Sequence, residues 1–387
     1  MLFRSGLGGT SSSFVQFGQA SGTAAVGTFD VAPTFNLGSG GLSIIYSQEG
    51  AARTSGVEIP VSRTLQGVTI NNTNGVTLSG GAASTAALTL TAGNLNTSSA
   101  NLLTVTGTTT GAITGGSATS FVNGPIARAL PASLIIGSTY NFPTGKSGYN
   151  NFQLVNPTTN AGGTVTVQAE VFDGNSGGTP GNLMGSINTS RYWAASITDG
   201  GANFTNTLVR LNDTRGTQDA IAASATQNGA YDQQGGVVAT LATNFITTTA
   251  PELTNLPGFF LMGNLAAASL SNLAITPSGN QCTNVARTVT VTATPGGAPV
   301  ATVVINYQVD GGANQQVSMT NIGGNDWQGT IPTVTPANGT VTWSVQATDN
   351  NSLQSNISGT SYQDEPLFSV SVSAAASPST VCSGSPS

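Results

Sequence analysis

Side chains that could carry out chemistry are few and widely spaced in this sequence. The 387 residues include no histidine, which removes the Ser-His-Asp and Cys-His catalytic sets and every histidine-ligated zinc site. No glycine-rich phosphate loop follows a strand and opens a helix. The close acidic groups are Asp213 with Asp219 and Asp364 with Glu365. Because acidic loop residues are usually just solvated, we expect no catalytic residues and no enzyme activity.

Two turn-like segments offer oxygen ligands of the kind that a hard cation prefers. They are residues 173–175 (Asp-Gly-Asn) and 349–351 (Asp-Asn-Asn). The candidate calcium ligands are therefore Asp173, Asp349 and Asn351. Asp, Asn and Gly are also the ordinary residues of tight turns, which is the favoured alternative. No other cofactor is expected.

Aromatic side chains are the candidates for stacking on a sugar ring. Tyr192 and Trp193 are neighbours on an expected strand and point to opposite faces, so one of them can be exposed. With Tyr149 they form the candidate glycan contacts, although packing in a core is the favoured alternative. Trp343 alternates with valines and is expected to be a core residue.

The two cysteines, Cys282 and Cys382, have neither metal-binding spacing nor a redox motif. A disulfide between them and a disulfide from each to a cysteine outside this chain both remain open.

Composition limits the habitat and the partners of the protein. Charged residues make up 6% of the chain, against ~25% in ordinary soluble proteins. A net charge of −6 and a single lysine, Lys146, argue against nucleic acid and against anionic membrane surfaces. No apolar run of ~20 residues predicts a membrane span. Thr, Gly and Asn enrichment at low charge suits an extracellular β-protein, and the absence of a signal-like apolar start predicts a fragment.

A repetitive stretch from Leu65 to Gly116 organises the chain. Short apolar pairs recur at a period of two and are separated by Asn, Gly, Thr and Ser, which tolerate tight corners. The pairs are Val68/Ile70, Val76/Leu78, Leu88/Leu90 and Leu103/Val105. They are too short to close a core alone, so stacking into a parallel β-helix, or solenoid, is predicted. A flat antiparallel meander is the alternative, because period two does not fix strand direction.

The remaining chain predicts antiparallel β-sandwiches, which makes the fold class all-β. Short strand candidates separated by turns follow the solenoid, and strictly alternating strands with Gly-rich hairpin turns follow these. The expected domains are a cap or tail of a preceding module (1–35), a β-solenoid (36–124), a β-sandwich (125–265), an immunoglobulin-like or fibronectin-like sandwich (275–370) and the start of a further module or linker (371–387). Residues 269–275 are expected to begin the linker between the two sandwiches.

Several segments resemble modules of very large surface proteins from Bacteroidetes. INNTNGVTLSGG, LTLTAGNLNT and LLTVTG are similar to their solenoid modules, and GSATSFVNGPIARALP resembles the linker that closes these. FPTGKSGYNNFQLVNP, SRYWAAS and PGFFLMGN resemble the following sandwich. The segment from VINYQVDGG to VTWSVQATDN resembles an immunoglobulin-like repeat, and SAAASPSTVCSGSPS the start of another. The resemblance covers roughly residues 40–387 and implies export by the type IX secretion system, although the sorting domain typical of such proteins is absent here.

Three functional classes follow from these observations. The first is a non-catalytic structural or adhesive segment of an extracellular surface protein or filament, with partners in neighbouring modules or in other copies through strand addition. The alternative is a carbohydrate-binding accessory region of a secreted polysaccharide-degrading enzyme or peptidase, with polysaccharide as the partner. A solenoid enzyme such as a polysaccharide lyase ranks last, because Leu65–Gly116 contains no charged residue.

Overall fold

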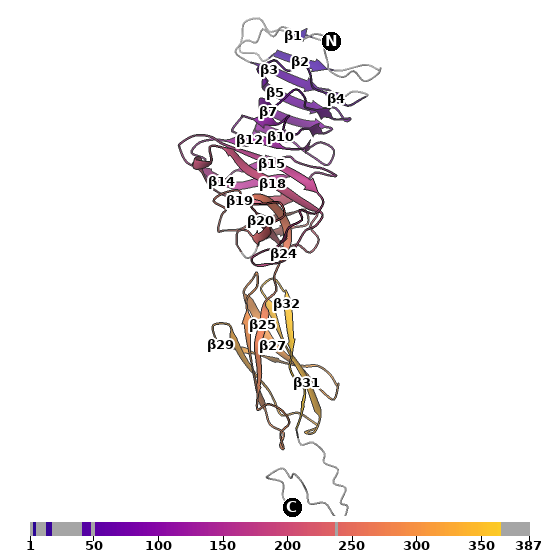
Figure 1. Ribbon diagram of the computed structural model, residues 1–387, viewed down its shortest axis with the longest axis vertical. Helices are drawn as coiled ribbons and strands as arrows, with labels where there is room; N and C mark the ends of the chain where they lie inside the picture. Colours follow the sequence, from indigo (N-terminus) through magenta and orange to yellow (C-terminus); the bar gives the residue numbers. More distant parts are fainter. Residues whose placement is uncertain (1–2, 5–12, 18–40, 48–50, 237–238, 365–387) are drawn as a thin grey trace, which may run out of the picture. The chain divides into compact units, whose positions relative to one another are not determined.

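A computed structural model describes residues 3–4, 13–17, 41–47, 51–236 and 239–364 of the chain (Figure 1). Contacts divide the chain into two compact units, Met1–Asn264 and Leu265–Ser387. Almost every regular element in the described residues is a strand, so the predicted all-β class is confirmed. None of the helices in the described part of the chain has the length and apolar character needed to cross a lipid bilayer.

The first unit begins with the predicted solenoid, whose strands pair in parallel. Its main sheet contains β2 (Ser13–Phe17), β3 (Leu42–Tyr46), β5 (Thr64–Asn71), β7 (Ala83–Ala92), β9 (Leu103–Val105) and β12 (Ile126–Leu130), with β1 (Phe3–Arg4) antiparallel to β2 and β10 (Ile113–Gly115) beside β7. Parallel pairing excludes the meander alternative. Ile44, Val68 and Leu88 lie opposite one another in register and are buried. Each such side chain contributes about 1.5–3 kcal/mol of burial free energy.

A second, narrower sheet closes the solenoid. It contains the two-residue strands β4 (Arg53–Thr54), β6 (Val76–Thr77), β8 (Leu95–Asn96) and β11 (Val122–Asn123), again in parallel. The apolar pairs of the sequence thus supply both sheets. Between the sheets the chain turns at glycines such as Gly75 and Gly93, whose φ angles are +83° and +73°.

The solenoid continues into a sandwich without a break in its sheet. β12 pairs in parallel with β9 on one side and antiparallel with β15 (Val165–Asp173) on the other. The sheet therefore changes from parallel to antiparallel pairing at β12. The sheet then continues through β18 (Arg191–Asp199), β24 (Gly258–Leu265), β20 (Ala220–Ser224), β21 (Ala230–Gln233) and β16 (Thr179–Pro180), with β17 (Met184–Ile187) beside β24. The facing sheet contains β13 (Thr139–Phe142), β14 (Phe152–Thr159), β19 (Phe204–Asn212), β23 (Phe245–Thr247) and β22 (Thr240–Ala242); two short 3-10 helices are η1 (Thr110–Ala112) and η2 (Gly201–Asn203).

One hydrophobic core extends from the solenoid into this sandwich. A fully buried arginine, Arg128 on β12, lies where the two parts meet. Its guanidinium donates hydrogen bonds to the carbonyl oxygens of Asn141 and Thr109 and lies 4.7 Å from the centre of the Tyr140 ring. Burial lowers the pKa of Arg128 to about 10.

The second unit is a sandwich of two antiparallel sheets. One contains β25 (Ser269–Thr276), β26 (Arg287–Thr294), β30 (Asp326–Ile331) and β29 (Thr320–Gly323). The other contains β28 (Gln315–Ser318), β27 (Val300–Val309), β31 (Thr340–Asp349) and β32 (Gln354–Ser358), with β33 (Tyr362–Gln363) beside β31. Their inward faces form a separate core that includes Trp343, as the alternation predicted.

One sequence-based prediction is wrong here: the residues expected to begin a linker form strand β25, which pairs with β26. A β-bulge interrupts the strand between Ser271 and Ala274 and hides its period-two pattern. The predicted division at 36–124, 125–265 and 275–370 remains a prediction. Residues 371–387 lie outside the described residues, as do residues 1–35 apart from β1 and β2.

Candidate functional site

A groove opens at one edge of the C-terminal sandwich, between the edge strands β25 and β32. It has a volume of about 770 Å³, and its walls come from these two strands and from the connection between β32 and β33. Its principal lining residues are Leu273, Ile275, Trp343, Ile357, Ser358 and Tyr362. The groove therefore combines apolar side chains with hydroxyl groups, a mixture that suits a ligand with both hydroxyl and C–H surfaces.

The bulge in β25 shapes one wall of the groove. Asn272 has a φ of +52°, and its side-chain amide donates a hydrogen bond of 3.3 Å to the hydroxyl of Thr292 on the neighbouring strand. After this irregularity Leu273 and Ile275 are half-buried and line the groove. Because of the bulge, Leu273 and Ile275 face the groove. In an unbroken strand they would lie on the opposite face of the sheet.

Trp343 supplies the floor of the groove rather than an exposed stacking surface. Its side chain is buried, and its indole N–H donates a hydrogen bond of 2.9 Å to the carbonyl oxygen of Thr360. A Cβ atom on Gly359 would lie 2.1 Å from the Trp343 ring, so only glycine allows this approach. The apolar surface available to a ligand therefore comes mainly from the half-buried aliphatic side chains.

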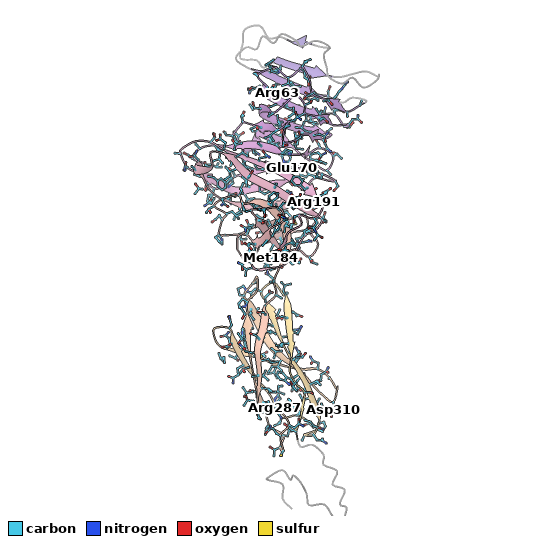
Figure 2. All side chains as sticks on the ribbon, in the orientation of Figure 1. Arg63, Glu170, Met184, Arg191, Arg287 and Asp310 are labelled. Carbon is cyan, nitrogen blue, oxygen red and sulfur yellow. The ribbon has the colours of Figure 1, made fainter. Side chains whose placement is uncertain are left out.

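Tyr362 lies where the groove meets a buried ion pair. Within the described residues, its hydroxyl has no hydrogen-bond partner. The Arg287 guanidinium carbon lies 3.7 Å from the centre of the Tyr362 ring. Arg287, which is labelled in Figure 2, forms an ion pair with Asp364. Burial raises the pKa of Tyr362 to about 12; the Arg287 charge opposes this rise and the Asp364 charge adds to it.

We expect the C-terminal sandwich, which contains Tyr362, to lose stability as the pH rises from 10 to 12. In this window an unfolded tyrosine, whose pKa is about 10, has lost its proton. Folded Tyr362, with a pKa of about 12, retains its proton, so the folded state binds more protons and the free energy of unfolding falls. Urea denaturation at successive pH values checks this. The chain contains no histidine, so stability should vary little between pH 6 and 9.

Tyr362→Phe is the control for the alkaline transition. Its free energy of unfolding should decline less steeply with pH than that of the wild-type protein. Arg128 acts in the opposite direction, because its folded pKa is lowered to about 10, but it is present in both proteins. Parallel pH profiles for the two proteins would contradict the assignment to Tyr362.

No positive charge is available to a ligand in the groove. Arg287 is the one basic residue in the sequence after residue 264, and its side chain is fully buried against Asp364. Asp310 and Asp326 are exposed elsewhere on this unit. An anionic ligand would therefore find no partner for its charge, whereas a neutral polyhydroxyl ligand would not require one.

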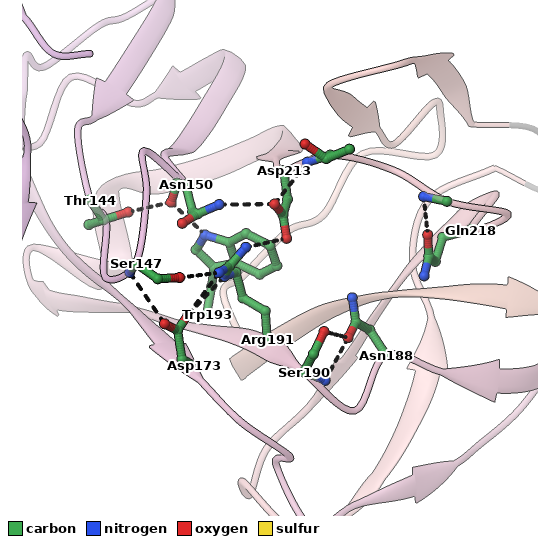
Figure 3. Close-up of polar contacts among 12 residues, drawn as sticks. Thr144, Ser147, Asn150, Asp173, Asn188, Ser190, Arg191, Trp193, Asp213 and Gln218 are labelled. Carbon is green, nitrogen blue, oxygen red and sulfur yellow. Dashed lines mark hydrogen bonds and ion pairs between the residues drawn. The ribbon is translucent and has the colours of Figure 1, made fainter. Parts of the chain in front are cut away.

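A second cleft lies in the first unit, at the ends of β18 and β19 (Figure 3). Its volume is about 550 Å³, and it is bordered by Tyr149, Asn150, Arg191, Asp213 and Asn244. Arg191 donates hydrogen bonds of 2.6 Å to Asp213 and 2.8 Å to Asp173, and one of 3.0 Å to the Ser147 hydroxyl. Burial lowers the pKa of Arg191, but the two carboxylates outweigh burial and leave its pKa raised.

The predicted glycan contacts are distributed differently from the expectation. Tyr149 is half-buried and borders the second cleft. Tyr192 and Trp193 are both buried, which is the core packing that the sequence favoured, and neither offers an exposed ring. Trp193 packs between the sheets and donates its indole N–H to the Asn150 carbonyl oxygen at 2.9 Å, while Tyr192 stacks on Phe172 with ring centres 4.9 Å apart. Both faces of the strand are thus covered.

Two of the candidate calcium ligands, Asp173 and Asp349, accept hydrogen bonds from other groups of the protein. Asp173 accepts hydrogen bonds from Arg191; burial raises its pKa, but these bonds and one from Ser147 lower it overall. One oxygen of Asp349 accepts hydrogen bonds from the backbone amides of Asn351 and Leu353 and thereby closes the turn after β31. Among the described residues, no three His, Cys, Asp or Glu side chains gather as a metal-binding group. Calcium binding remains a prediction.

Cys282 is disulfide-bonded. Its proposed partner, Cys382, lies outside the described residues, so the pairing remains a prediction.

The groove was not identified by sequence reasoning. Of its two aromatic residues, Trp343 lies in the core as predicted, but one wall is β25, where the sequence predicts a linker. The hydroxyl-rich run Ser358–Gly359–Thr360–Ser361 was the available signal, since it follows a strand and precedes another aromatic residue.

Comparison with known families places a match on this sandwich. The family model described as Carbohydrate binding module family 56 matches residues 280–357. This range runs from just before β26 into β32, and of the groove's lining residues it contains Trp343 and Ile357. A comparison with curated proteins found no match.

Proposed function

We propose that this chain is a non-catalytic segment of an extracellular protein and that its C-terminal sandwich binds carbohydrate. The observation that carries the proposal is the family match over residues 280–357, which points to carbohydrate binding. It favours the accessory-module alternative over the structural or adhesive segment. The attachment to a secreted enzyme or peptidase, and the relationship to Bacteroidetes surface proteins exported by the type IX system, are parts of the proposal that rest on the sequence resemblance.

We place the carbohydrate in the groove between β25 and β32. Its half-buried Leu273, Ile275 and Ile357 provide apolar surface for the C–H face of a sugar ring. Ser358 and Thr360 are exposed and provide hydroxyl groups that both donate and accept hydrogen bonds. Because no cation is available there, the expected ligand class is a neutral polysaccharide.

A polysaccharide panel tests this proposal on the full chain. Affinity electrophoresis with soluble neutral glucans, mannans and xylans should retard migration for at least one of them, and anionic pectin or alginate should have a smaller effect. Ser358→Arg places a long side chain in the groove and should weaken retention at least tenfold. Ser358 is exposed at the end of an edge strand, so the substitution should not prevent folding.

Ser318→Arg is the matched control. Ser318 is also an exposed serine at the end of an edge strand, β28, but on the opposite edge of the same sheet and away from the groove. This variant should bind like the wild-type protein. Equal retention by the two variants would remove the groove as the site, and failure of every polysaccharide to retard the wild-type protein would remove the function.

A further inference from the structure

The cleft bordered by Tyr149, Asn150, Arg191, Asp213 and Asn244, here called the Arg191 cleft, lies outside the residues matched by the carbohydrate-binding family. Five segments converge on it: the connection between β10 and β11, the connection between β13 and β14, the start of β18, the end of β19 with the loop after it, and the turn between β22 and β23. Its polar side chains meet in a space of about 550 Å³, large enough for one or two sugar rings.

The charged groups of the Arg191 cleft pair with one another. The Arg191 guanidinium lies between the carboxylates of Asp213 and Asp173, with closest N–O distances of 2.6 and 2.8 Å (Figure 3). One cation faces two anions, so an anionic ligand would be repelled. A metal ion would have to compete with the guanidinium for both carboxylates. This arrangement selects against charged ligands and fixes the polar groups in place.

An unpaired acceptor is built into the wall of the cleft. Asn150 is 4% exposed, and its side-chain amide donates a hydrogen bond of 3.0 Å to Asp213. Since a carboxylate only accepts, this bond fixes the orientation of the amide and directs its oxygen elsewhere. Within the described residues that oxygen has no partner. A buried acceptor without a donor is costly, and a ligand hydroxyl that reached it with a small shift of the wall would satisfy it.

The wall that carries this acceptor is held rigidly. The Asn150 carbonyl oxygen accepts hydrogen bonds from the Trp193 indole at 2.9 Å and from the Thr144 hydroxyl at 2.8 Å. The Asn150 backbone amide donates one of 3.0 Å to the carbonyl oxygen of Thr144. Figure 3 shows the Thr144 and Trp193 side chains reaching the Asn150 carbonyl oxygen beside Arg191. A preorganised wall loses little conformational freedom when a ligand binds.

Further hydrogen-bonding groups and an aromatic ring complete the cleft. The Tyr149 hydroxyl accepts a hydrogen bond of 3.1 Å from the Asn141 amide, so its own proton remains available to a ligand acceptor. Burial raises the pKa of Tyr149, so the hydroxyl keeps this proton at neutral pH; the Asn141 bond opposes the rise. Asn244 is exposed at the rim. Amides and hydroxyls beside a half-buried ring match the alternating donors, acceptors and C–H surfaces of a saccharide.

We propose that the Arg191 cleft is a second saccharide-binding site, specific for neutral sugars and independent of the groove in the C-terminal sandwich. The choice of sugars as the ligand class draws on the proposed function, but the cleft and its residues are separate from it. One chain would then contact carbohydrate at two places, which raises retention on a polymer without new contacts at either site.

The test uses the full chain with its groove blocked. In the Ser358→Arg background, titration with neutral oligosaccharides of two to six glucose, mannose or xylose units, followed by ligand-observed NMR, should still detect binding. Adding Tyr149→Phe removes the free O–H and should weaken binding three- to tenfold, and adding Asn244→Ala as well should weaken it more than tenfold. Asn228→Ala, an exposed asparagine in the turn between β20 and β21, is the matched control and should have no effect.

The outcomes separate the two sites. Binding that survives Ser358→Arg and falls with the Tyr149 and Asn244 substitutions supports the cleft, whether or not the groove also binds. No oligosaccharide binding in the Ser358→Arg protein overturns the cleft proposal and leaves the groove intact. The cleft proposal is also overturned if the Tyr149 and Asn244 substitutions change binding no more than Asn228→Ala does. Circular dichroism of each variant verifies that loss of binding is not loss of folding.

Discussion

Asp364→Asn should destabilise the C-terminal sandwich by about 3–5 kcal/mol. Asp364 is 1% exposed and pairs with Arg287, which is fully buried. The carboxylate also accepts backbone hydrogen bonds from Gln281 at 3.0 Å and Val285 at 3.4 Å. The substitution removes the negative charge and leaves a guanidinium buried without a counter-ion. Urea denaturation followed by tryptophan fluorescence measures the effect, since Trp327 and Trp343 both lie in this unit.

Asp326→Asn is the control for the ion-pair prediction. Asp326 is exposed and accepts a hydrogen bond of 2.6 Å from the Thr292 hydroxyl, which an asparagine oxygen can also accept. It should change the free energy of unfolding by less than about 1 kcal/mol. Equal effects of the two substitutions would mean that the buried pair contributes nothing beyond an ordinary surface residue.

A double substitution separates the charge from the hydrogen bonds around it. Arg287→Met with Asp364→Leu removes both charges and should be less destabilising than Asp364→Asn alone, because no unpaired ion remains. Recovery should be incomplete. Arg287 also donates hydrogen bonds to the carbonyl oxygens of Pro277 and Gly279, at 2.6 and 2.7 Å, and these acceptors would lose their donor.

The solenoid was predictable because short apolar pairs recur along its sequence, and its fold requires one such pair on each strand. Each short apolar pair has to stack on the next one, and the observed register places Val68 opposite Leu88 and Ile70 opposite Leu90. The period of two does not determine whether the strands are parallel or antiparallel. The polar residues between the pairs, which tolerate tight corners, favoured the parallel solenoid. The burial of Arg128 was not predictable from the sequence. Its partners are three backbone carbonyl oxygens and an aromatic ring rather than a carboxylate, and no sequence pattern identifies such partners.

The sandwiches were predictable in class but not at every strand. Strict alternation identified β26, β27 and β31, whereas the bulge at Asn272 concealed β25. The candidate site depended on that missing strand. Period two also predicts only that Tyr192 and Trp193 face opposite sides; it does not say whether either side is open. Here the facing sheet covers Trp193, and Phe172 and Phe259 lie beside Tyr192.

Gly93→Ala should destabilise the first unit by more than about 3 kcal/mol. Gly93 lies at a solenoid corner with a φ of +73°, and a Cβ there would lie 1.7 Å from the Asn72 carbonyl oxygen. That oxygen is already fixed, because it accepts a hydrogen bond of 2.8 Å from the Gly75 amide. The backbone of two successive turns would have to separate. Urea denaturation followed by far-ultraviolet circular dichroism measures the loss.

Gly111→Ala tests whether crowding at the corner, rather than glycine content, causes this effect. Gly111 lies in η1 of the same solenoid, has no atom within 4 Å of a built Cβ and does not require a positive φ. Alanine there should change stability by no more than about 1 kcal/mol, in the stabilising direction, because it restricts the unfolded chain. If both substitutions were neutral, the close stacking of corners would not limit the solenoid. If both were severe, glycine would be needed for a reason other than contact between successive turns.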